Sequence, residues 1–155
     1  MGVTQTQRKI RDLSLQNWDH VSVQTAYEMH CNNQGRIVDV RHPREIEDSP
    51  PAAGAVFLPL YILRGFLGEP ARAEEDEAPL ATIVSTMPSY LGMLNLFAAH
   101  RLRLLCLCRS GRDSLEAVRL LHLLGYQNAS SVAGGMEAWA AANLPVVRNH
   151  QGTPE

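Results

Sequence analysis

Short apolar runs alternate along the chain with longer stretches in which apolar residues recur every three or four positions. The runs are bounded by glycine, proline or polar residues and predict strands; these span 36–40, 55–58, 103–107 and 129–132. The periodic stretches predict helices; these span 22–31, 89–100, 113–124 and 134–142, with a turn or short helix at 43–46. Strands that alternate with helices predict an α/β fold, a parallel β-sheet of about five strands with helices on both faces.

Two of the expected helices have recognisable ends. Ser22 precedes the first helix and is a favoured N-cap residue. Asp113 and Glu116 have the spacing of a capping box, and Gly125 follows the last periodic residue of the same helix. The sequence therefore predicts that the Asp113 carboxylate caps the helix that begins there.

The length of 155 residues fits one domain with a hydrophobic core of its own. We expect this domain at residues 18–147, after a loosely ordered N-terminal extension (1–17) and before a flexible tail (148–155). Residues 69–79 hold five acidic residues, one arginine and a proline near each end, which predicts a solvated surface loop within the domain.

Charge and cysteine usage exclude several classes of partner. A net charge of −2 argues against nucleic acid or an anionic membrane as the main partner. The most apolar region, 90–108, is interrupted by His100, Arg101 and Arg103, so no membrane span is expected there. The three cysteines form no C-x-x-C pair, and residues 1–19 lack the apolar segment of a signal peptide. A cytoplasmic protein with free thiols is the expectation.

The strongest chemical signal is Cys108, which follows the apolar run 103–107 and precedes a short glycine-containing loop and a helix. This order places the cysteine at the carboxyl end of a buried strand, where open α/β sheets bind ligands. Loop amides and the helix dipole there favour a thiolate over a thiol. Cys108 is therefore the candidate nucleophile, with a buried structural cysteine as the alternative.

The other cysteines and the histidines carry weaker signals. Cys106 lies two residues earlier on the expected strand and shares a face with Cys108, so either a core position or a resolving role is open. Cys31 belongs to no motif. His42, His100 and His122 lack metal-ligand spacing, and no metal or cofactor is predicted.

Four motifs in order resemble the rhodanese (sulfurtransferase) family over roughly residues 18–147. They are Ile37–Arg41 followed by Pro43, Gly54-Ala55 with Pro59-Leu60, the loop Cys108-Arg109-Ser110-Gly111 with Ser114, and Leu123–Tyr126 with Gly134–Trp139. The resemblance implies a single-domain rhodanese-like fold. It also implies an enzyme whose cysteine takes a sulfane sulfur from a donor such as thiosulfate, holds it as a persulfide and passes it to a thiol or cyanide-like acceptor.

The resemblance also assigns roles to particular residues. Cys108 would be catalytic, and Arg109, Ser110, Gly111, Arg112 and Asp113 would surround the donor. Asp39 and Arg41 match a buried pair of the family, and they and Ser114 would support the pocket. A protein-partnered persulfide carrier or redox relay is the alternative to a thiosulfate enzyme, since both would use the same residues.

Two details of the loop bear on its substrate. Cysteine phosphatases place an arginine six positions after the cysteine, where this chain has Ser114, so phosphatase chemistry is not expected. Asp113 stands where many rhodaneses have arginine. A carboxylate there would weaken the capture of a dianion such as thiosulfate unless Arg109 or Arg112 compensates.

Overall fold

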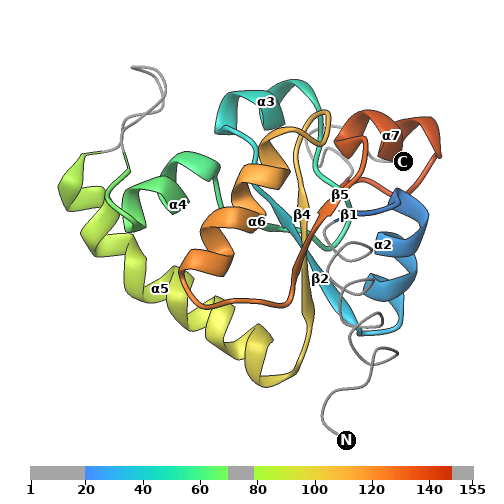
Figure 1. The fold of residues 1–155 in the computed structure, drawn as a ribbon. Helices are drawn as coiled ribbons and strands as arrows, with labels where there is room; N and C mark the ends of the chain where they lie inside the picture. The colour runs from blue at the N-terminus through green and yellow to red at the C-terminus, as the bar shows by residue number, and fades with distance from the viewer. Residues whose placement is uncertain (1–19, 70–78, 148–155) are drawn as a thin grey trace, which may run out of the picture.

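The computed structural model describes residues 20–69 and 79–147, which form a five-stranded sheet in the order β1-β5-β4-β2-β3 (Figure 1). The strands are β1 (His20–Val21), β2 (Gly35–Asp39), β3 (Val56–Phe57), β4 (Arg103–Leu107) and β5 (Ala129–Val132). All four pairings between neighbouring strands are parallel. The predicted α/β class with a parallel sheet is confirmed.

Helices cover both faces of the sheet (Figure 1). They are α2 (Val23–Cys31), α3 (Pro43–Asp48), α4 (Leu60–Phe66), α5 (Leu80–Ala99), α6 (Asp113–Leu123) and α7 (Gly135–Ala141). In Figure 1, α4, α5 and α6 lie on one side of the sheet and α2 and α7 on the other, while α3 sits near the carboxyl ends of the strands. The predicted helices on both faces are confirmed.

The central strand β4 explains why two hydrophobic cores form. Its side chains alternate, so Leu104, Cys106 and Cys108 face the core beneath α6, whereas Leu105 and Leu107 face the core that contains Trp139 of α7. All five of these β4 and loop residues are nearly inaccessible to solvent. β4 is therefore buried on both faces, and Cys108, which follows it, packs into the core beneath α6.

The largest departure from the sequence prediction is α5, which begins at Leu80 instead of residue 89. Pro88 lies inside it, although proline lacks the N–H of a helix interior and usually marks a boundary. α4 and the two-residue β1 were not predicted, and residues 43–48 form a helix. α5 has no charged side chain and is the one described helix whose length and composition would allow a membrane crossing. Length and composition alone do not separate such a span from an ordinary apolar helix.

Three sequence predictions lie wholly or largely outside the described residues. The structure does not describe the extension 1–17, the tail 148–155 or residues 70–78 of the acidic loop. The two ends of that loop are described. Glu69 forms ion pairs with Arg64 of α4 and Arg119 of α6, and Pro79 is the N-cap residue of α5.

Candidate active site around Cys108

Cys108 follows β4 directly, at the edge where the parallel strands end and between the neighbours β2 and β5. Only 2% of the residue is exposed. The loop 108–112 then leads into α6, as the sequence predicts. The side chain therefore lies at the carboxyl edge of the sheet, where the amides of the loop 108–112 can reach it.

Two backbone amides point at the Cys108 sulfur. The N–H of Gly111 donates to Sγ at 3.0 Å and the N–H of Ser114, in the first turn of α6, donates at 3.3 Å. Gly111 adopts φ +98°, a conformation that side chains disfavour. A sulfur that receives two N–H groups and faces a helix start is better suited to carry negative charge than a sulfur among apolar side chains.

The sulfur also replaces the helix cap that the sequence predicts. The N-cap of α6 is Arg112, and no side chain there accepts a hydrogen bond from the helix amides. Asp113 is the first residue inside the helix, so the predicted Asp113 capping box is wrong. The physical reason is that Sγ of Cys108 already accepts the Ser114 amide, one of the orphan donors of the first turn. Glu116, the other half of the predicted box, instead pairs with Arg64 and Arg119.

A hydroxyl pair lies behind the sulfur. Ser114 Oγ is 3.4 Å from Cys108 Sγ and 2.6 Å from Oγ of Ser131 on β5. Both serines are fully buried. Ser114 was expected to support the pocket and does contact the sulfur; Ser131 was not anticipated, because only the fold brings residues 17 positions apart together.

The start of α7 holds the backbone of the loop from the other side. The N–H of Met136 donates to the Cys108 carbonyl at 2.7 Å, and the N–H of Glu137 donates to the Arg109 carbonyl at 3.0 Å. Gly135 approaches so closely that a Cβ there would lie 2.4 Å from the Cys108 oxygen. The Gly134-Gly135 motif therefore serves close backbone contact with the loop that carries Cys108.

A pocket of about 380 Å³ opens over the sulfur, lined by Glu45, Cys108, Arg109, Ser110, Arg112 and Asp113. The predicted donor-binding residues thus surround one cavity, with Gly111 contacting the sulfur beneath it. Glu45 of α3 was missed by sequence reasoning, because only the fold brings α3 to the loop that carries Cys108. Two arginines and two carboxylates line the pocket. Arg109 also forms an ion pair with Glu137, with 3.5 Å between Nε and Oε2.

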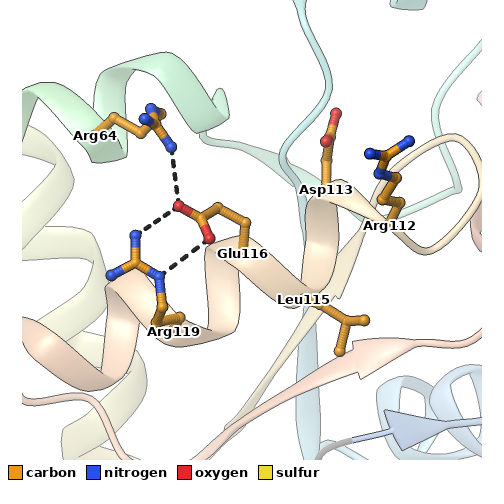
Figure 2. A pocket seen from close by; sticks show the side chains of 6 residues that line it. All are labelled: Arg64, Arg112, Asp113, Leu115, Glu116 and Arg119. Atoms are coloured by element: carbon orange, nitrogen blue, oxygen red, sulfur yellow. Dashed lines mark hydrogen bonds and ion pairs between the residues drawn. The ribbon is translucent and has the colours of Figure 1, made fainter. Parts of the chain in front are cut away.

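A second recess adjoins this pocket and shares Arg112 and Asp113 with it (Figure 2). On its far side, Glu116 lies between Arg64 of α4 and Arg119 of α6 and contacts both at 2.9 and 2.6 Å. Those two arginines are therefore engaged with carboxylates. Arg112 has no hydrogen-bond or ion-pair partner among the residues that the structure describes, and it stands at the boundary between the two cavities.

Asp39 and Arg41 form the expected buried pair. The Arg41 guanidinium donates to both Asp39 oxygens at 2.8 to 3.2 Å and to the Ser49 carbonyl at 2.9 Å. Both side chains are 1% exposed. The pair ties the end of β2 to the residue after α3, and it does not line the pocket over Cys108. Its position fits a structural role better than contact with a substrate.

The remaining cysteines lie apart from this chemistry. Burial, and then the nearby Cys108, raise the pKa of the Cys106 thiol to about 12, so Cys106 stays protonated at neutral pH. Cys31 lies exposed on α2. No three histidine, cysteine or acidic side chains cluster as metal ligands within residues 20–69 and 79–147.

Comparisons with known proteins identify the family and the fold. The family model for the rhodanese-like domain matches residues 22–142. A maize protein, the adenylyltransferase and sulfurtransferase MOCS3-2, is 38% identical over 61 residues, which are 39% of this chain and 12% of that protein. The chain therefore spans only a small part of that relative's length.

Two solved structures show the same fold. A Rhodopseudomonas palustris protein of unknown function, described as a possible tyrosine phosphatase, superposes with a TM-score of 0.60 at 18% identity, covering 90% of this chain and 92% of the other. The human single-domain sulfurtransferase TSTD1 superposes with a TM-score of 0.53 at 22% identity, covering 81% and 97%. Since the family model covers most of the chain, including Cys108 and strands β2 to β5, this chain belongs to the rhodanese-like domain family.

Proposed function

We propose that the protein is a sulfurtransferase that carries a sulfane sulfur as a persulfide on Cys108. The observation that supports this most is the sulfur itself, which receives the amides of Gly111 and Ser114 beneath an open polar pocket. Such amides stabilise a thiolate, the form that attacks sulfur. Membership in a family that includes sulfurtransferases supports the same chemistry.

The transfer proceeds in two displacements. The Cys108 thiolate attacks the outer sulfur of thiosulfate, the S–S bond of thiosulfate breaks, and its electron pair leaves with sulfite. The terminal sulfur of the new persulfide then forms a bond to the acceptor, a thiolate or cyanide, and the electron pair of the broken S–S bond returns to Cys108. Neither step requires protonation of the leaving group, so no general acid is needed.

Arg112 is the residue proposed to attract an anionic donor. Glu45 and Asp113 offset part of the positive charge of the pocket, and Arg109 is shared with Glu137. Arg112 lines the pocket without an ion-pair partner in the described part of the chain, so its charge is available to the donor.

Two other functions would also use a cysteine at this position. Phosphatase chemistry would need an arginine six positions after the cysteine, and Ser114 occupies that position as a buried hydroxyl. A carrier that receives its persulfide from a partner protein would use the same cysteine and cradle. The partial neutralisation of the pocket favours this second candidate, because a dianion such as thiosulfate gains little from a balanced charge.

The test is to incubate the protein with thiosulfate and to measure its intact mass. A gain of one sulfur is expected in the wild type and in Cys106→Ser and Cys31→Ser, and none in Cys108→Ser. Sulfur on another cysteine would refute the assignment of Cys108. Loading by a cysteine desulfurase persulfide, but not by thiosulfate, would establish the carrier instead of the thiosulfate enzyme.

A further inference from the structure

The buried hydroxyl pair behind Cys108 forms a chain of hydrogen bonds that ends on the reactive sulfur. Ser131 Oγ lies 2.6 Å from Ser114 Oγ, which lies 3.4 Å from Cys108 Sγ. Ser114 and Ser131 have no exposed surface, so water cannot supply a substitute partner from bulk solvent. The chain links β5 through α6 to the residue after β4.

Each serine hydroxyl has one proton and can donate only one hydrogen bond. When Cys108 is a thiol, its S–H donates to Ser114, and either serine can donate in the 2.6 Å contact between Ser114 and Ser131. When Cys108 is a thiolate, the proton is lost to solvent and the sulfur can only accept. Ser114 must then turn its proton toward the sulfur, and its oxygen is left as an acceptor that Ser131 fills by donating. Ionisation of the sulfur thus sets the direction of the hydrogen bond between the two serines.

We propose that Ser131 is a positioning residue for the Cys108 thiolate, acting through Ser114. It donates to the Ser114 oxygen, which orients the Ser114 hydroxyl toward the sulfur and polarises it. Hydrogen bonds in such chains strengthen one another, and a charged acceptor makes the effect larger in the ionised state. The chain therefore stabilises the thiolate more than the thiol. This role concerns the sulfur that the proposed function uses, but it is a statement about the ionisation of Cys108 and does not require sulfur transfer.

The charged and titratable groups around the sulfur are separate from this chain. They are Glu45 of α3, Arg109 and Arg112 of the loop, Asp113 of α6, Glu137 of α7, Cys106 of β4 and His20 of β1, which pairs with Ser131 in the sheet. Removal of the Ser131 hydroxyl leaves all of them in place. A change in the pH dependence of Cys108 after that removal is therefore a change transmitted by Ser114.

The experiment measures the rate at which iodoacetamide alkylates Cys108 as a function of pH, with the modified peptide identified by mass spectrometry. Ser131→Ala is expected to raise the pH midpoint by about 0.3–0.5 unit, because cooperativity is a fraction of one charge-assisted hydrogen bond. Ser114→Ala, which removes the direct donor, is expected to raise it by about one unit. Ser131→Thr keeps the hydroxyl and is expected to restore the wild-type midpoint.

Ser130 provides the matched control. It is the neighbouring residue on β5 and is equally buried, but its hydroxyl accepts from Arg103 and not from Ser114. Ser130→Ala should leave the midpoint unchanged, even if it lowers the free energy of unfolding. In a Ser114→Ala background, Ser131→Ala should cause no further shift, because the link to the sulfur is already gone.

A midpoint that does not move in Ser131→Ala, or that moves equally in Ser130→Ala, overturns the role of Ser131. A downward shift overturns it as well. The proposed function fails separately, if thiosulfate and persulfide donors leave Cys108 unloaded while the alkylation profile behaves as expected.

Discussion

Substitution of Gly135 by alanine tests how α7 holds the loop that carries Cys108. Gly135 has φ +57°, and a Cβ at this position would lie 2.4 Å from the Cys108 oxygen and 2.6 Å from the Arg109 carbonyl carbon. Those neighbours are backbone atoms and cannot rotate away. Ordinary contact begins near 3.4 Å, so α7 or the loop must move by about 1 Å to accept the methyl group.

That movement determines by how much Gly135→Ala lowers the free energy of unfolding. A shift of about 1 Å would stretch the 2.7 Å bond from Met136 to Cys108 beyond hydrogen-bond range, and would weaken the bond from Glu137 to Arg109. Each lost bond costs about 0.5–1.5 kcal/mol. The positive φ adds about 1–2 kcal/mol of strain, of which about 0.4–1 kcal/mol is offset by the reduced entropy of the unfolded chain. We expect Gly135→Ala to lower the free energy of unfolding by about 2–4 kcal/mol.

The assay is urea unfolding, with Gly68→Ala as the matched control. Gly68 has φ +69°, but a Cβ there would meet no atom within 4 Å. Its substitution therefore measures the backbone strain alone and should cost about 1 kcal/mol or less. If Gly135→Ala costs no more than Gly68→Ala, the close approach of α7 to the loop does not constrain the site and the reasoning is refuted. Alkylation of Cys108 should also change in Gly135→Ala and stay the same in Gly68→Ala.

Arg112→Ala is expected to raise KM for thiosulfate and to reduce its salt dependence, whereas Asp113→Asn should lower KM; unchanged kinetics in Arg112→Ala would exclude it from donor capture. Asp39→Asn leaves the Arg41 guanidinium buried without its carboxylate and should cost about 3–5 kcal/mol in urea unfolding, so a cost well below 1 kcal/mol would contradict the buried pair. Burial, and then Arg36, lower the pKa of His30 below 6.5, so the unfolded chain binds more protons and stability should fall as pH drops through 6.5. This fall should be smaller in His30→Gln, and parallel pH curves for the two proteins would show that His30 does not contribute.

Features encoded within a few neighbouring residues could be predicted from the sequence. The position of Cys108 after a buried strand follows from the apolar run 103–107, and the loop follows from Gly111. The start of α5 could not be predicted, because Pro88 lies inside the helix. In addition, residues 80–87, which precede Pro88, carry no charged side chain that would mark the solvent-facing side of a helix. Proline disfavours the interior of a helix, but tertiary packing can override this preference.

Features that depend on contacts between distant segments could not be predicted. Glu45 and Ser131 reach the site from α3 and β5, and no local spacing relates either one to Cys108. The capping prediction failed for a related reason. Asp113 and Glu116 have the right spacing, but the sequence does not reveal that a sulfur five residues before Asp113 is already in place to accept a helix amide.

Because the Ser114 amide donates to the Cys108 sulfur, this sulfur acts as a cap for the first turn of α6. A sulfur that gains a second sulfur, becomes oxidised or is alkylated changes size and charge at the point where α6 begins. The proposed sulfur-transfer cycle would therefore alter the start of that helix at each step, and amide hydrogen exchange in its first turn would report the chemical state of Cys108. Cys108→Ala is also not a neutral inactive variant, since loss of a helix cap typically costs about 0.5–2 kcal/mol. Serine, which retains an acceptor, is the substitution that separates the chemistry of this residue from its contribution to stability.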